Sequence, residues 1–159
     1  MPATNWSKLN RQQLGAYAEY WAKLEFVSYG FHVYTSEIDD HGVDFVTESP
    51  AGELFCVQVK SVRGDNYTFI RKDKIVFDDR HLVCYMRFEE GAMPEVFVFP
   101  ASVWNSPNEL FVDRNYNSQG QKSKPEYGIQ YSAKNRHLLE GYEAEVFLLE
   151  LAGNSDKLD

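Results

Sequence analysis

The chain has 159 residues, 43% of them hydrophobic and 15% aromatic, a composition that fits one globular domain and excludes a disordered chain. No apolar run approaches the ~20 residues of a membrane-spanning helix, and residues 1–5 lack the pattern of a signal peptide, so we expect a cytoplasmic protein without membrane contact. The net charge of −8 and the pI of about 5.0 argue against a surface coated with basic residues for non-specific nucleic-acid binding.

The first predicted element is a helix from about Arg11 to Tyr29, and Gly30 after it is typical of a helix end. Its apolar stripe consists of Leu14, Tyr17, Ala18, Trp21, Leu24 and Ser28. Strands are predicted next at 31–35, 43–47 and 53–62, with turns at 39–42 and 49–52 between them. The third strand alternates, which places Phe55, Val57 and Val59 on one face and Cys56, Gln58 and Lys60 on the other.

The second half of the chain predicts strands at 67–70, 81–88 and 95–99, and a short helix that begins at 101–104. Residues 105–128 are rich in Asn, Ser, Gly and Lys, so we expect a long irregular loop there. A C-terminal helical segment is predicted within about 133–152, with a helix around 133–142. This order of elements predicts a single α/β domain with a central mixed β-sheet flanked by helices and a core of about 10–104.

The chain has two cysteines, Cys56 and Cys84, each within an apolar run that predicts a strand. Isolated cysteines of this kind are usually buried free thiols, and no Cys and His spacing suits a zinc site. We therefore expect two free thiols.

Two carboxylates occupy unusual places in this pattern. Glu19 shares its side of the helix with Gly15, Ala22 and Phe26, and a carboxylate among such neighbours needs water, a cation or a metal. Asp44 lies within a predicted strand, where Asp is rare, so it either caps a turn, forms a salt bridge or has a role at the strand end.

Gln58 and Lys60 are two residues apart in the neighbouring strand, and their side chains therefore emerge on one face. A lysine that projects towards a buried sheet face needs an anionic partner, which is either Asp44 or a bound phosphate. Oxygen atoms of Asp44, of the Gln58 side chain and of the Val59 backbone carbonyl are ligands that suit Mg²⁺ or Mn²⁺, with Glu19 bound directly or through water. Such a metal serves the hydrolysis of phosphodiesters.

These residues resemble the core of the PD-(D/E)XK nuclease superfamily. The matching segments are Ala16-Tyr17-Ala18-Glu19, Gly42-Val43-Asp44 and Gln58-Val59-Lys60-Ser61, within Gly15 to Arg63. The pattern is similar to Mrr-like restriction endonucleases, Holliday-junction resolvase-like proteins and small uncharacterised bacterial domains. The resemblance implies a restriction-endonuclease-like core in which Glu19, Asp44, Gln58 and Lys60 are catalytic. Gln58 departs from the Asp or Glu that the superfamily more often has, which predicts weaker metal binding.

The resemblance implies a Mg²⁺- or Mn²⁺-dependent DNA endonuclease. We expect no organic cofactor, and we expect a homodimer because cutting both strands of a duplex commonly needs two sites. Two alternatives stay open: a catalytically weak nuclease-fold module that binds DNA or protein, and a structural domain in which Glu19, Asp44 and Lys60 form a buried ion network. Basic residues gather in 60–74 and 114–137, and acidic residues in 140–159. The predicted DNA contacts are Ser61, Arg63, Arg71, Lys72, Lys74, Lys122 and Lys124.

Overall fold

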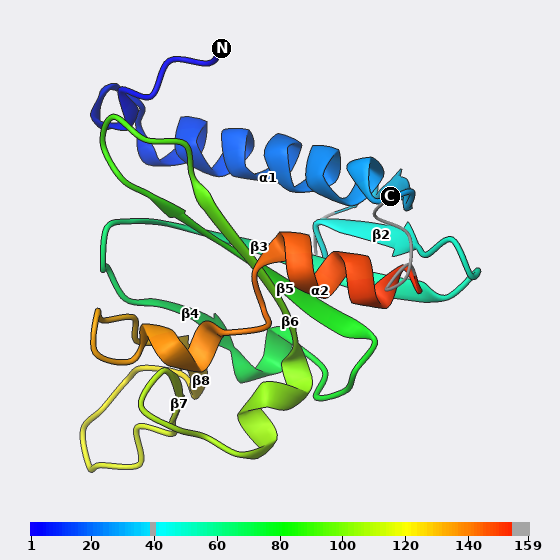
Figure 1. The fold of residues 1–159 in the computed structure, drawn as a ribbon. Coiled ribbons are helices and arrows are strands. Elements are labelled where there is room, and N and C mark those ends of the chain that lie inside the picture. The colour runs from blue at the N-terminus through cyan, green and yellow to red at the C-terminus, as the bar shows by residue number, and fades with distance from the viewer. Residues whose placement is uncertain (39–40, 154–159) are drawn as a thin grey trace.

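The structure is a computed structural model that describes residues 1–38 and 41–153. A central sheet has the strand order β1-β2-β3-β5-β6 (Figure 1). Its strands are β1 (His32–Thr35), β2 (Phe45–Glu48), β3 (Leu54–Arg63), β5 (His81–Phe88) and β6 (Glu95–Pro100). The pair β3 and β5 is parallel and the other neighbours are antiparallel, which confirms the predicted mixed sheet.

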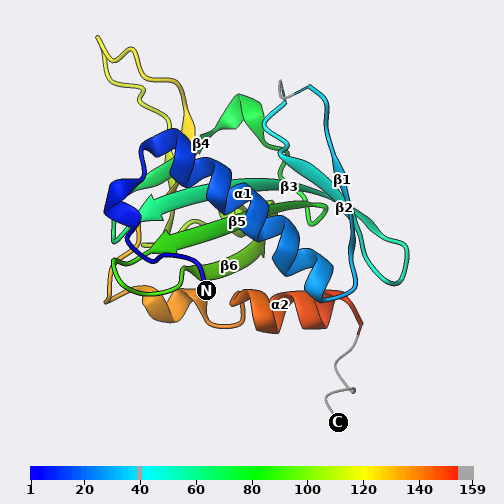
Figure 2. The same cartoon turned by 90° about the horizontal axis from the view of Figure 1, so that it is seen from above.

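Two helices, α1 (Arg11–Ser28) and α2 (Ala144–Leu151), pack on one face of this sheet, and Figure 2 shows α1 lying across it. Asn10 starts α1, because its side chain accepts the Gln13 N–H at 2.8 Å and the Gln13 side chain accepts the Asn10 N–H at 2.9 Å. The fully buried positions of α1 are Leu14, Ala18, Ala22 and Phe26. The predicted stripe was wrong at Leu24, which is 62% exposed, and at Ser28, which is also exposed, and it left out the buried Ala22 and Phe26.

A smaller antiparallel sheet covers the other face of the central sheet (Figure 1). It has the order β4-β8-β7, with β4 (Thr68–Arg71), β7 (Phe111–Arg114) and β8 (Glu126–Ile129). Strand β5 lies between the two layers, since Leu82, Cys84 and Met86 pack towards the helices while Val83 and Tyr85 pack towards the small sheet. This double burial explains why its sequence is an almost continuous apolar run.

The C-terminal third differs from the prediction. The segment expected to be an irregular loop contains β7 and β8. The helix expected around 133–142 is only a 3-10 helix (Arg136–Leu139), and the regular helix α2 begins later, at Ala144. The first two residues of the predicted turn at 39–42 lie outside the described residues. Both cysteines are free thiols, as predicted, with Cys84 buried and Cys56 half-buried. Among the described helices, none is long and apolar enough to cross a bilayer.

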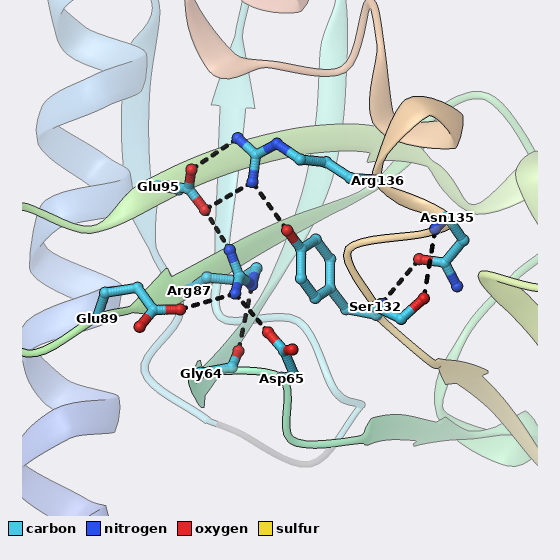
Figure 3. Close-up of polar contacts among 9 residues, drawn as sticks. Gly64, Asp65, Arg87, Glu89, Glu95, Ser132, Asn135 and Arg136 are labelled. Carbon is cyan, nitrogen blue, oxygen red and sulfur yellow. Dashed lines mark hydrogen bonds and ion pairs between the residues drawn. The ribbon is translucent and has the colours of Figure 1, made fainter.

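A buried arginine joins the last third of the chain to the central sheet (Figure 3). Arg87, at the end of β5, is 4% exposed and pairs with Asp65 at 2.8 Å, with Glu89 at 2.9 Å and with Glu95. Its guanidinium lies 3.6 Å from the centre of the Tyr131 ring. Several charged partners compensate the burial of one cation, so the network fixes β5, β6 and the segment that precedes α2 relative to each other.

Candidate active site

Asp44 lies immediately before β2, at the point where β2 stops pairing with β3. The last residue pair of this ladder is Phe45 with Val57. Asp44 extends it in two ways: its backbone N–H donates to the Val57 carbonyl at 2.9 Å, and its Oδ2 accepts the Val59 N–H at 2.7 Å. The carboxylate is therefore held against the edge of β3 by the backbone of that strand.

The same contacts fix the direction of the β3 side chains. Phe55 and Val57 are buried against the helices, and Val59 packs beside them. Because side chains alternate along a strand, Gln58 and Lys60 project from the opposite face, as the sequence predicted. The Gln58 side chain lies close to Gly42, and its Oε1 is a buried atom that accepts no hydrogen bond from the described residues.

Gly42 allows the segment before Asp44 to approach this part of β3. Its φ is +73°, a value that side-chain-bearing residues rarely adopt. A Cβ at this position would lie 2.7 Å from the Lys74 carbonyl oxygen and 3.4 Å from the Gln58 Nε2. The glycine of the Gly-Val-Asp motif is thus required both for the turn and for the close contact of three segments.

Lys60 is half-buried and lies at the edge of a groove. Burial lowers the pKa of Lys60 from its ordinary value, and the negative charge of Asp44 partly opposes this shift. Within residues 1–38 and 41–153, the Lys60 ammonium forms no ion pair closer than 4 Å. A cation in this position is available to an anionic ligand.

The groove beside Lys60 has a volume of about 350 Å³ and lies between α1, β3 and β4. Gly15 of α1 lines it, together with Lys60 and Ser61 of β3. Glu19 is half-buried and interacts with other groups of the protein. It lies one helical turn after Gly15, on the same side of α1. The structure therefore brings Asp44, Gln58 and Lys60 together and places Glu19 on the helix side that borders the groove.

Other residues line this groove that no sequence motif indicated. A second hollow of about 160 Å³ continues it and shares Arg11, Ser61, Tyr67 and Thr68 with the first. Phe69 of β4 lines the first hollow. The sequence predicted a strand at 67–70, but no pattern in it indicated that this strand lies beside Lys60.

Neither a family model nor a curated protein matches the chain. Two solved structures do. One is the bacterial homing endonuclease I-Ssp6803I, with 17% identity, a TM-score of 0.58, and coverage of 95% of this chain and 100% of that chain. The other is the Holliday junction resolvase Hjc of the archaeal hyperthermophile Archaeoglobus fulgidus, with 13% identity, a TM-score of 0.52, and coverage of 90% and 98%.

The chain has the fold of the PD-(D/E)XK-type nucleases. This confirms the restriction-endonuclease-like α/β core that the sequence motifs predicted. At these identities the likeness establishes the fold, and function has to be argued from the site.

The donor atoms at the site of this nuclease fold suit a hard cation. No group of three His, Cys, Asp or Glu side chains in the described residues is arranged to hold a metal, so the carboxylates need other oxygens to complete a site. The buried Gln58 Oε1 is one such oxygen. The Val59 carbonyl is another, because the N–H and C=O of one strand residue point to the same side, and the Val59 N–H points to Asp44. These oxygens fit Mg²⁺ or Mn²⁺.

The predicted DNA contacts differ in what surrounds them. Ser61 lines the groove, and Lys122 and Lys124 are exposed on the connection from β7 to β8. Arg71 pairs with Asp73, Lys72 pairs with Asp113 and Asn115, and Lys74 contacts the Gly42 turn. The Arg63 guanidinium donates to the carbonyls of Trp6 (3.0 Å) and Leu9, which ties the N-terminal segment to β3.

Proposed function

We propose that this protein is a DNA endonuclease that hydrolyses phosphodiester bonds with Mg²⁺ or Mn²⁺. The observation that carries the proposal is the meeting of Asp44 and Lys60 at one edge of β3, beside a buried Gln58 oxygen without a donor among the described residues. On a PD-(D/E)XK-type nuclease fold, this combination supplies oxygen ligands and a cation at one point.

Each of the four residues has a chemical role in this proposal. Asp44, the Gln58 Oε1 and the Val59 carbonyl would hold the metal, with Glu19 bound directly or through water. A metal held by these oxygens would supply a Lewis acid for a phosphoryl oxygen and for the attacking water. Lys60 orients the attacking water and stabilises the negative charge that develops on the phosphate, and its partial burial strengthens this interaction.

DNA is the proposed substrate, because the two similar structures are a homing endonuclease and a Holliday junction resolvase. The proposed contacts to its backbone are Ser61, Arg71, Lys72, Lys74, Lys122 and Lys124. We leave Arg63 out of this set, since its guanidinium serves the N-terminal segment. Cleavage of both strands of a duplex commonly uses two sites, so we propose a homodimer, and light scattering that finds only monomers with and without DNA would refute it.

A second candidate is a nuclease-fold module that binds DNA or protein with little catalysis. Two observations favour it: Gln58 provides a neutral oxygen where a carboxylate would bind metal more strongly, and the net charge is −8. The two candidates differ in whether phosphodiester bonds break.

The test is to incubate the purified protein with plasmid, branched and single-stranded DNA in Mg²⁺ or Mn²⁺, beside Asp44→Ala and Asp44→Asn. We expect cleavage by the wild type of at least one substrate and by neither variant. Asn keeps an oxygen that accepts the Val59 N–H, so Asp44→Asn separates the loss of charge from the loss of this structural contact. Metal-dependent binding without any cleavage would favour the second candidate.

A further inference from the structure

An exposed aromatic side chain lines the groove that also contains Lys60. Phe69 of β4 is 45% exposed and lines the same hollow as Lys60 and Ser61. Its cross-strand partner on β8 is Gly128, which has no side chain to cover it. Tyr67 immediately precedes β4, and its ring is stacked on Phe69 with centroids 6.1 Å apart and an angle of 22°.

Contacts with three residues hold the Tyr67 ring in place beside Phe69. A Cβ at Gly128 would lie 2.1 Å from the Tyr67 hydroxyl oxygen, so the ring occupies the space that only glycine leaves open. The Tyr67 hydroxyl donates to Glu126, which is 5% exposed. The Arg114 guanidinium lies 4.3 Å from the centre of the Tyr67 ring. These contacts fix Tyr67, and they provide a firm support for the exposed ring of Phe69.

Cations surround this aromatic pair. Arg11 is exposed at the start of α1 and lines both hollows of the groove. Arg71 follows Phe69 by two residues and therefore emerges on the same face of the small sheet. The pKa of Asp73 is lowered by a hydrogen bond from Arg71 and by the charges of Arg71, Lys124 and Lys74. All three cations therefore lie near that carboxylate. The groove and the small sheet thus combine positive charge with one accessible aromatic ring.

We infer that the groove binds a DNA strand with an unpaired nucleotide beside the scissile phosphate, and that the base of this nucleotide stacks on Phe69. The inference rests on the proposed function and adds a substrate class to it. A base inside a duplex is stacked on both sides, whereas a base in a gap, flap or branch has a free face for an aromatic ring. Arg11 binds a neighbouring phosphate along the groove, and Lys60 contacts the scissile one.

The test measures binding by fluorescence anisotropy in EDTA, where no metal-dependent cleavage occurs, with a flapped DNA and with a perfect duplex of the same sequence. The proteins are the wild type, Phe69→Ala, Phe69→Leu and Phe69→Trp. We expect the Ala and Leu variants to bind the flapped DNA about 10-fold more weakly, because base stacking is lost, while Trp retains affinity. Duplex binding stays unchanged in all three. Arg11→Ala weakens both DNAs equally and reduces the salt dependence.

Equal affinity of Phe69→Ala and the wild type for the flapped DNA would overturn the inference. It would also be overturned if Phe69→Ala lost the same factor in affinity for the flapped DNA and for the duplex. Cleavage assays in Mg²⁺ on the same DNAs separate the two proposals. If the wild type cuts DNA and Phe69→Ala keeps the same preference between flap and duplex, only the inference fails. If the wild type cuts neither DNA but binds the flap through Phe69, the nuclease proposal fails and the nucleotide site stands. Circular dichroism checks that each variant is folded.

Discussion

The half-buried ammonium group of Lys60 lowers the stability of the folded protein. Because burial lowers its pKa, the unfolded chain binds more protons than the folded one between the lowered and the ordinary pKa. The free energy of unfolding therefore rises with pH across that interval. At a pH below it, Lys60 is charged in the folded protein, and the full destabilising effect of the buried charge is present. A residue that destabilises the fold in this way is typical of a site kept for function.

We predict that Lys60→Met raises the melting temperature at neutral pH and lowers the cleavage rate by about 100-fold or more. The gain in melting temperature shrinks as the pH is raised, because the wild-type lysine loses its charge. Thermal unfolding between neutral and alkaline pH measures the first effect and single-turnover cleavage the second. Lys23→Met on α1 is the matched control. A variant that cuts DNA at the wild-type rate would contradict the role assigned to Lys60.

Gln58 allows the metal proposal to be tested without any DNA. Replacing its neutral amide by the carboxylate of Gln58→Glu adds a negative charge beside Asp44 and Lys60, and a bound divalent cation favours this carboxylate over the neutral amide. We predict that Mn²⁺ raises the melting temperature of Gln58→Glu by more than it raises that of the wild type. The control is Gln58→Leu, whose melting temperature we expect Mn²⁺ to raise by less than that of the wild type. If Mn²⁺ stabilises Gln58→Glu no more than it stabilises the leucine variant, Gln58 is not a metal ligand.

At the scale of the elements, the small sheet depends on one glycine. We predict that Gly128→Ala lowers the stability by about 1–3 kcal/mol, because the new methyl group overlaps the Tyr67 ring. Chemical denaturation measures the change. In the background of Tyr67→Ala the same substitution has a much smaller effect, since the obstructing ring is gone. If Gly128→Ala lowers the free energy of unfolding equally in the wild-type and Tyr67→Ala backgrounds, Tyr67 does not fill this space.

The sequence predicted those elements whose signals are local. The alternation around Gln58 and Lys60 and the apolar run of β5 identified the central strands, and a turn with a glycine placed Asp44 next to them. Strands β7 and β8 were missed because they lie in or next to a segment rich in Asn, Ser, Gly and Lys, and β8 pairs with β4, which is distant in the sequence. Phe69 and Arg11 were missed as site residues for the same reason, since only the packing of β4 and α1 brings them to Lys60.

At the scale of the whole molecule, the network around Arg87 connects the two halves of the chain (Figure 3). Hydrogen bonds from Arg136 lower the pKa of Glu95, and the charges of Arg136 and Arg87 add to this effect. A carboxylate with a lowered pKa stabilises the fold above its ordinary pKa, and this contribution is lost as the pH falls through the lowered value. The ionised form of Glu95 thus helps to hold the C-terminal segment on the central sheet.

We predict that Glu95→Gln lowers the melting temperature at neutral pH and that the difference from the wild type disappears in acid, where Glu95 is protonated. Melting curves between neutral pH and about pH 2 show the convergence. Glu89→Gln removes a more exposed partner of the same arginine, 53% exposed against 35% for Glu95, and has a smaller effect. A difference that stays constant down to the lowest pH would mean that Glu95 acts through its shape and not through its charge.

The central claim is that Asp44 holds a metal for the hydrolysis of DNA. The most direct measurement is the single-turnover cleavage rate of supercoiled plasmid as a function of Mn²⁺ concentration, for the wild type and for Asp44→Asn. The proposal predicts a rate that is zero in EDTA, rises with Mn²⁺ to a plateau in the wild type, and falls by at least about 100-fold in Asp44→Asn, which unfolds at a similar temperature. Cleavage by Asp44→Asn at the wild-type rate, or a wild type that cuts no DNA at any Mn²⁺ concentration, would contradict it.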